Sequence, residues 1–206
     1  MGRNSSRESM RSRIAAAAAR IMAEDGVDDF AMAKRKAARR LGAGDTQALP
    51  RNDEIETELR AYRALYQAGE HPAQIAALRR EALEAMRALE RFNPYLTGAV
   101  LKGIAGPHAA VELQLFPVNP KEVELFLLEH GIAYSTAEAR RYAGDRAHAA
   151  TILTLDWQGT TLRLSVFDYR DERVALKTSL AGRTLERAGI REVSALLAGE
   201  DGVAKT

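Results

Sequence analysis

Apolar residues follow two different spacings in the two halves of this 206-residue chain. Up to about residue 92 they recur every three or four positions, which is the period of an α-helix. Gly26, Gly42, Gly44 and Pro50 interrupt this pattern and separate its segments. We therefore expect four helices in the first half, over residues 8–24, 31–41, 52–66 and 72–92.

After Asn93-Pro94 the pattern changes, because apolar and polar residues begin to alternate as they do in β-strands. The clearest alternation is AVELQLF, and Gln158-Gly159 joins two further runs in a predicted hairpin. We expect strands at 96–102, 110–116, 151–157 and 160–169, and helices at 120–131 and 184–198. The prediction is an α+β fold with a helical region (1–93), an α/β domain (94–200) and a flexible tail (201–206).

Composition narrows the classes of function only slightly. The chain has no cysteine, which excludes disulfides, thiolate metal sites and cysteine nucleophiles. No apolar run approaches the roughly 20 residues that span a bilayer. The alanine-rich start is interrupted by Arg20 and followed by Glu24, so it indicates an amphipathic helix, not a signal peptide. We expect a cytoplasmic protein without a membrane partner, of undetermined oligomeric state.

Two runs of basic residues stand out against a net charge of only +2. One contains Arg3, Arg7, Arg11 and Arg13, and the other contains Lys34, Arg35, Lys36, Arg39 and Arg40. Clustered cations attract phosphate backbones, so the second run is a candidate nucleic-acid-binding surface for RNA or DNA. The alternative is an ordinary solvated helix face.

The stretch from Leu96 to Phe116, LTGAVLKGIAGPHAAVELQLF, carries the most specific spacing. An apolar strand ends at Gly98-Ala99, about ten loop residues follow, and a second strand places Glu112 between apolar neighbours. Glycines in such a loop allow backbone amides to approach a phosphate closely. Carboxylates at positions i and i+2 of a strand share a face and can bind one magnesium ion together.

This stretch resembles the signature of the nucleotidyltransferase superfamily, of the minimal bacterial and polymerase-β-like types. The resemblance covers residues 95–117 and extends to 198 only through the order of elements. It implies that Gly98, Ala99, Lys102 and Gly103 cradle phosphates, and that Glu112 binds magnesium with a nucleoside triphosphate. His108 lies in the same loop, where it is a candidate nucleotide contact or a solvated residue.

The sequence departs from this signature at the carboxylates. The first position holds Ala110, so only Glu112 remains of the pair. Arg163 aligns best with the third carboxylate, although Asp156 and Asp168 lie nearby in the sequence. Glu112 and Asp156 are therefore the candidate catalytic residues, with an exposed edge-strand position as the alternative for Glu112.

Three hypotheses remain open from the sequence. The first is a catalytically degenerate nucleotidyltransferase-like protein that binds a nucleotide or nucleic acid. The second is an active magnesium-dependent nucleotidyltransferase that uses Glu112 with a carboxylate such as Asp156. The third is a helical nucleic-acid-binding or regulatory protein.

A second resemblance bears on the third hypothesis. Residues 14–42 are similar to the opening of tetracycline-repressor-type DNA-binding domains, which contain a helix-turn-helix. A recognition helix is expected after a short turn, but Pro50 and the acidic Asp53, Glu54 and Glu56 occupy that place here. Phosphates would repel such a helix start, which favours a plain helical bundle.

Overall fold

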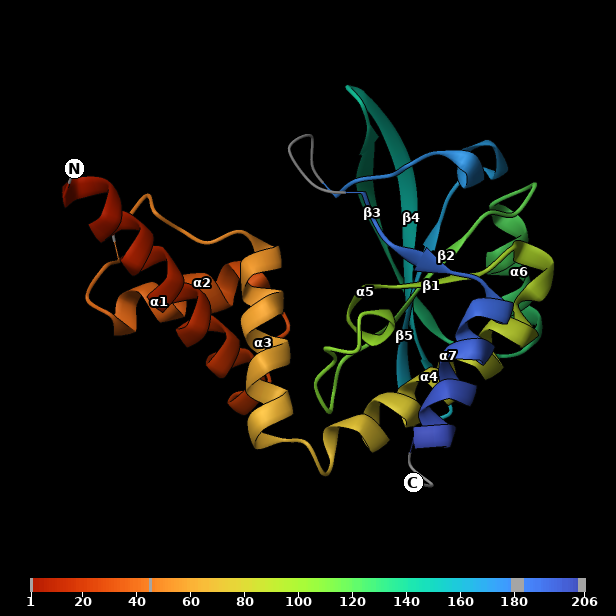
Figure 1. Cartoon of the computed structure of the whole chain (residues 1–206). Helices are drawn as coiled ribbons and strands as arrows, with labels where there is room; N and C mark the ends of the chain where they lie inside the picture. Colours follow the sequence, from red (N-terminus) through yellow and green to blue (C-terminus); the bar gives the residue numbers. More distant parts are fainter. Residues whose placement is uncertain (1, 45, 179–183, 204–206) are drawn as a thin grey trace. The chain divides into compact units, whose positions relative to one another are not determined.

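The computed structural model describes residues 2–44, 46–178 and 184–203, with the backbone alone for 2–7 and 201–203 (Figure 1). The chain divides into two compact units. Unit 1 comprises Met1–Gln74 and Ile104–Ala109, and unit 2 comprises Ile75–Gly103 and Ala110–Thr206. This division falls near the start of the fourth helix, after Gln74, and so earlier in the chain than the change of pattern at Asn93-Pro94.

Unit 1 is built on three helices, α1 (Gly2–Glu24), α2 (Phe30–Arg40) and α3 (Asn52–Tyr66). Helix α1 packs against both of the others, and Ile14, Ile21, Ile55 and Leu59 are buried among them. Asp29 caps α2 by accepting a hydrogen bond from the amide of Met32. The predicted N-terminal helical region is thus confirmed. Residues 41–51 separate α2 from α3, a longer connection than the turn of a helix-turn-helix.

Helix α3 buries a different face from the one its apolar residues indicate. Leu65 and Tyr66 continue the apolar spacing of this helix, but they are 72% and 67% exposed. Ile55, Leu59 and Arg63, which are spaced four residues apart, form the buried side instead. The buried guanidinium of Arg63 is stabilised there because it donates a hydrogen bond to a loop carbonyl of unit 1.

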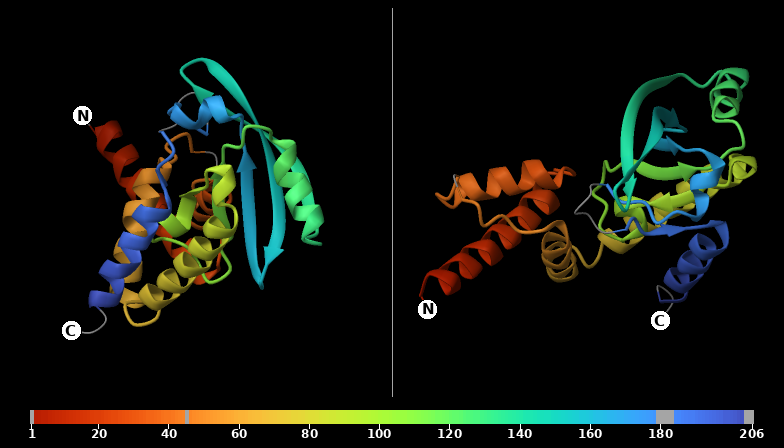
Figure 2. Two further views of the ribbon diagram at one scale, coloured as in Figure 1. Left: turned by 90° about the vertical axis from the view of Figure 1, so that its right-hand side faces the viewer. Right: turned by 90° about the horizontal axis from the view of Figure 1, so that it is seen from above.

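Unit 2 contains a six-stranded mixed sheet, which confirms the α+β fold. Its strands are β1 (Tyr95–Thr97), β2 (Val111–Leu115), β3 (Tyr134–Ala143), β4 (Arg146–Trp157), β5 (Thr160–Val166) and β6 (Arg187–Ala188). Their order is β3-β4-β5-β2-β1-β6, and β2 and β5 are parallel while the other neighbours are antiparallel. Figure 2 shows the β3–β4 hairpin as a long curved teal ribbon.

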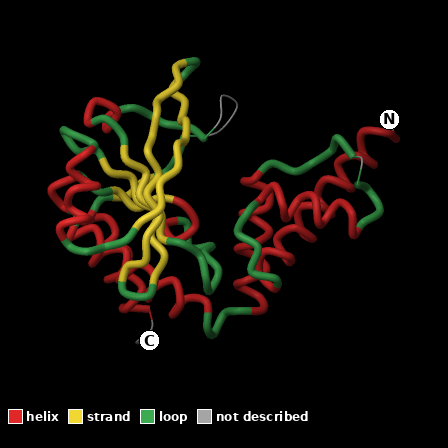
Figure 3. The backbone as a smooth tube through the Cα atoms, turned by 180° about the vertical axis from the view of Figure 1, so that it is seen from behind, coloured by secondary structure: helices red, strands yellow, loops and turns green. Residues whose placement is uncertain are grey.

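One face of the sheet forms the core with helices α4 (His71–Ala88), α6 (Lys121–Glu129) and α7 (Ile190–Val203). In Figure 1 and Figure 3 these three helices lie on the same side of the strands. Strand residues such as Leu113 and Leu164 are fully buried there, as are Met86, Val123 and Val193 from the helices. No helix of the described residues is long and apolar enough to cross a membrane.

The opposite face, which we call the polar face, carries Thr97, Glu112, Gln114, Arg163, Ser165 and Arg187. The segment that follows β5 covers part of this face. It begins with a 3₁₀ turn, η2 (Tyr169–Arg173), and Leu176 then packs in a second small core with Phe116, Ile152 and Phe167. Glu112 and Arg163 lie outside that small core.

Several element boundaries differ from those predicted. The strand expected at 96–102 stops at Thr97, and Gly98–Leu101 forms a short helix, α5, because Gly98 takes a positive φ of 73°. The helix expected at 184–198 begins only at Ile190, since Arg187–Ala188 pairs with β1 as β6. Helix α7 runs to Val203 into the expected tail, whose residues 204–206 lie outside the described residues.

Other boundaries follow the sequence closely. The hairpin at Gln158-Gly159 is confirmed, with Trp157 paired with Thr160. The fourth predicted helix becomes α4 followed by a 3₁₀ turn, η1 (Glu90–Phe92), before Pro94. Strand β3 was not assigned from the sequence, since most of its residues are exposed and carry no apolar alternation.

Candidate functional site

Glu112 lies in the interior of the sheet, because β2 has β5 on one side and β1 on the other. The edge-strand alternative for this residue is therefore wrong. Its neighbours in sequence, Val111 and Leu113, point into the core, so its own side chain points to the polar face, where it is 43% exposed. The strand thus presents a carboxylate at a position that a ligand can reach.

Gly98 lies directly against this carboxylate. A Cβ atom added to Gly98 would stand 2.7 Å from Oε2 of Glu112, closer than real Cβ atoms come. Gly98 also has φ of +73°, a conformation that side chains other than glycine adopt at a cost. The pairing of Thr97 with Glu112 across β1 and β2 brings the two residues together. Gly98 and Glu112, which the sequence pattern singled out, therefore lie in contact.

Arg163 stands beside Glu112 on the parallel neighbour β5, in the same register. Its Nη1 lies 3.5 Å from Oε1 of Glu112, and its side chain is 52% exposed. Arg141 of β3 reaches the same region: burial lowers the pKa of its guanidinium, Glu112 raises it and Arg163 lowers it. Arg163 thus lies beside the carboxylate and Arg141 interacts with it through its charge, so positive charge exceeds negative charge in this region.

The other candidate carboxylates do not join Glu112. Asp156 pairs with Thr161 at the end of β4 and accepts a hydrogen bond at 3.0 Å from the amide of Gly159, so it shapes the hairpin turn. Strand β5 lies between β4 and β2. Asp168 caps η2 by accepting a hydrogen bond from the amide of Arg170.

The donor set does not fit a magnesium centre. Ala110 offers no ligand atom, and the nearest charged neighbour of Glu112 is the cation Arg163. Among the described residues, no group of three or more histidine, aspartate or glutamate side chains is placed to hold a metal ion. We therefore derive no chemical step through a metal at this face.

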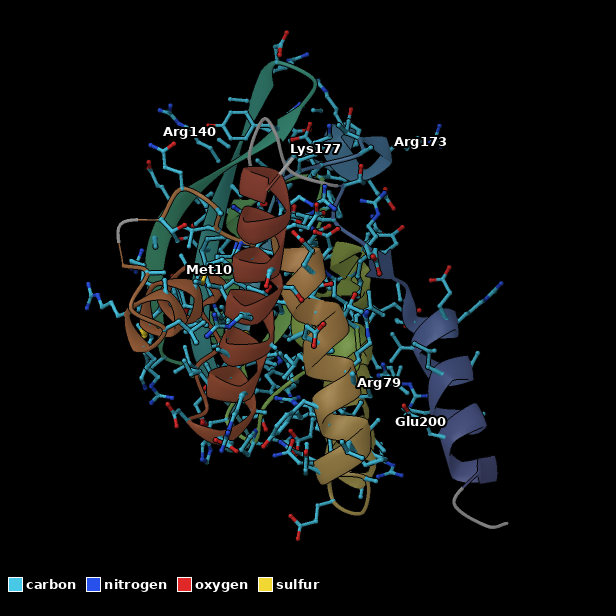
Figure 4. All side chains as sticks on the ribbon, turned by 60° about the vertical axis from the view of Figure 1, so that its left-hand side comes forward. Met10, Arg79, Arg140, Arg173, Lys177 and Glu200 are labelled. Atoms are coloured by element: carbon cyan, nitrogen blue, oxygen red, sulfur yellow. The ribbon has the colours of Figure 1, made fainter. Side chains whose placement is uncertain are left out.

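The first half of the glycine-bearing loop, Gly98–Gly103, is held from the core side by Arg79 of α4. This buried guanidinium donates from Nε to the carbonyl of Val100 at 3.2 Å and from Nη2 to that of Leu101 at 2.6 Å. Nη1 pairs with Glu200 of α7, as Figure 4 shows. Ala99 lies within α5, Lys102 follows α5, and Gly103 has φ of +68° beside Arg79.

The second half of the loop, residues 104–109, belongs to unit 1 and bonds to a second buried arginine. Nη1 of Arg63 donates to the carbonyl of Ala105 at 2.5 Å and lies 2.6 Å from Nε2 of His71. Burial lowers the pKa of Arg63, and burial together with Arg63 lowers that of His71. Burial raises the pKa of Asp28, although Arg63 and His108 oppose this shift.

The basic run on α2 is partly neutralised within unit 1. Asp25 accepts from Lys36 at 2.6 Å and from Arg40 at 3.3 Å. Nζ of Lys34 bonds to the side chain of Asn52, whereas Arg35 and Arg39 are exposed. In the other run Arg11 pairs with Glu54 and Arg13 is exposed, while the side chains of Arg3 and Arg7 lie outside the described residues.

The sequence did not point to Arg141, Arg79 or Arg63. Arg141 is 29 residues from Glu112 and reaches the polar face only because the β3–β4 hairpin extends the sheet. Arg79 and Arg63 stand in helices, where an arginine normally indicates an exposed face. Gln114 could have been found, since it follows Glu112 by two residues in a strand of period two.

Comparisons of the chain with protein-family models, with curated proteins and with solved structures find no match.

Proposed function

We propose that this chain is a nucleotidyltransferase-like protein without transferase activity, and that its polar face binds the phosphate groups of a nucleotide without a metal ion. The ion pair of Glu112 with Arg163 carries the proposal. Arg163 stands in register with Glu112, where the resemblance implies a third carboxylate. A fixed cation at this position repels a metal ion and attracts an anion.

The charges near Glu112 support binding of this kind. Arg163 and Arg141 together exceed the single carboxylate by one positive charge. A guanidinium group presents several donors in a plane and matches the oxygens of a phosphate. The arginines thus supply the compensating charge that magnesium supplies in two-metal chemistry.

Calorimetric titration with each nucleoside triphosphate, in EDTA and then in magnesium, tests the proposal. We expect binding in EDTA, and a loss of about tenfold in affinity in Arg163→Gln, since a hydrogen bond to a charged group is worth roughly 1.5–3 kcal/mol. Arg140→Gln is the matched control, because Arg140 adjoins Arg141 on β3 but points to the other face and is exposed (Figure 4).

Glu112→Gln separates the proposal from the active-enzyme hypothesis by the sign of its effect. Removing the carboxylate frees Arg163 for the ligand, so we expect equal or tighter binding of nucleotide in EDTA. Binding that needs magnesium and disappears in Glu112→Gln would contradict the proposal and favour an active transferase. Salt-sensitive RNA or DNA binding that is lost in an Arg35→Gln/Arg39→Gln variant would instead favour the helical nucleic-acid-binding hypothesis.

A further inference from the structure

A cavity of about 220 Å³ opens on the polar face, beside the segment that follows β5. Gln114 of β2 and Arg187 of β6 contribute from the sheet, and Arg173 and Thr184 contribute from the covering segment. Leu176 and Leu185 add apolar walls. This volume is below the roughly 300–1,000 Å³ of pockets for drug-sized ligands, so its occupant must be small.

Gln114 is the residue of this cavity that most favours a bound ligand. It is only 2% exposed, yet its side-chain amide makes no hydrogen bond with any residue in the described part of the chain. The residue is buried as a whole but lines the cavity, so its amide can form a hydrogen bond with a molecule bound there. Its flanking residues Leu113 and Leu115 are fully buried in the core, so the strand fixes the direction of the amide.

Two arginines give the cavity its charge. The guanidinium of Arg187 stacks over the rings of Tyr95 and Phe116, at 4.7 and 5.3 Å from their centroids, and donates one hydrogen bond to the carbonyl of Glu172. Four of its five N–H groups are not used by that bond. Arg173, labelled on η2 in Figure 4, is exposed at the same cavity. Neither arginine forms an ion pair with a carboxylate of the described residues.

The geometry points to this cavity as a binding site for a small organic anion, a molecule with one carboxylate or phosphate group and a compact apolar part. The anionic group meets the guanidinium groups of Arg187 and Arg173, the amide of Gln114 donates to a further oxygen, and the apolar part contacts Leu176 and Leu185. The site is separate from the Glu112–Arg163 pair and requires no nucleotide.

Gln114→Met gives a test in which a structural role and a binding role predict opposite results. Methionine has the length of glutamine without its polar groups, so removal of an unpartnered amide leaves the free protein equally stable or raises its melting temperature. The same change weakens anion binding by about tenfold, the worth of one hydrogen bond to a charged group. A lower melting temperature for the free Gln114→Met protein overturns the inference.

The probes are inorganic phosphate, methylphosphonate, acetate and propionate, titrated against the full chain by NMR while the backbone amide signals of Leu176 and Leu185 beside the cavity are followed. A saturable shift with the phosphorus probes assigns a phosphate ligand, and a shift with the carboxylates assigns a carboxylate ligand. The shift must weaken in Gln114→Met and Arg173→Gln but persist in Arg163→Gln. No shift with any probe, or a shift lost in Arg163→Gln alone, overturns the inference without touching the proposed nucleotide site.

Discussion

Each of the two units contains a buried arginine that holds one half of the glycine-bearing loop, and the two arginines differ in how fully they are satisfied. In unit 2, Arg79 bonds to two loop carbonyls and to the carboxylate of Glu200. In unit 1, Arg63 bonds to the carbonyl of Ala105 and contacts His71, while its Nε is buried without a partner.

The two arginines show two ways in which a protein stabilises a buried cation, one with a carboxylate partner and one without. A guanidinium with a carboxylate partner keeps its charge balanced inside the protein, so removing it leaves an unbalanced acid. A guanidinium without such a partner suffers from burial itself, and the pKa of Arg63 is lowered accordingly. We therefore expect residues 98–103 to be held tightly and residues 104–109 to respond to pH.

The largest expected effect separates the two arginines directly. Arg79→Met should destabilise unit 2 by about 3 kcal/mol, since it leaves Glu200 and two carbonyls without their donor. Arg63→Met should cost roughly 1 kcal/mol, because the hydrogen bond that is lost goes to a neutral carbonyl and Arg63 interacts with Asp28 only through its charge. Hydrogen exchange of peptides from each half of the loop measures both changes.

Arg87→Met on the same helix α4 is the control for Arg79→Met, as Arg87 is exposed. Equal costs for Arg79→Met and Arg63→Met would break the comparison between the two halves of the loop.

The next effect concerns Gly98, which fixes the start of the tightly held half. Gly98→Ala should cost about 2 kcal/mol, since a positive φ costs an L residue roughly 1–2 kcal/mol and the new methyl group displaces the Glu112 carboxylate. Gly131→Ala is the matched control, because Gly131 has a similar φ of +66° and nothing within 4 Å of the added Cβ.

Denaturant titration of both variants isolates the contact with Glu112. We expect the excess cost of Gly98→Ala to disappear in the Glu112→Ala background. If Gly98→Ala and Gly131→Ala cost the same in the natural background, the close contact contributes nothing to stability.

The smallest effect is a pH dependence of the half held by Arg63. The lowered pKa of His71 means that the unfolded chain binds a proton at higher pH than the folded one. The stabilisation is therefore complete above the ordinary histidine pKa of about 6.5 and is lost as the pH falls towards the lowered value. Exchange of residues 104–109 should accelerate over this window.

Asp28 and His108 also act near Arg63, so they need a control. The raised pKa of Asp28 has the opposite effect on stability, because protonation of Asp28 at low pH favours the folded state. The acceleration should persist in Asp28→Asn and vanish in His71→Gln. A pH dependence unchanged in His71→Gln would assign it to another group.

The sequence predicted the α+β fold well because spacing carries most of that information. Helical periodicity and glycine or proline stops located α1 to α4, and strict alternation located β2, β4 and β5. Prediction from the sequence failed for short segments whose structure depends on residues that are distant in the chain. Arg187–Ala188 is a strand only because β1 lies beside it, and Gly98–Leu101 turns into a helix that Arg79 holds.

The candidate site divides in the same way. The spacing of Gly98 and Glu112 was visible in the sequence, since both belong to one short stretch with a fixed length of loop. The strand pattern also aligned Arg163 with the third carboxylate position but left Asp156 open, and the register of β2 and β5 decides that Arg163 stands beside Glu112. Local periodicity thus determined which residues form helices and strands. Only the tertiary structure placed Arg163 and Arg141 near Glu112 and placed Gln114 and Arg187 at one cavity, because strand pairing joins residues that sequence distance separates.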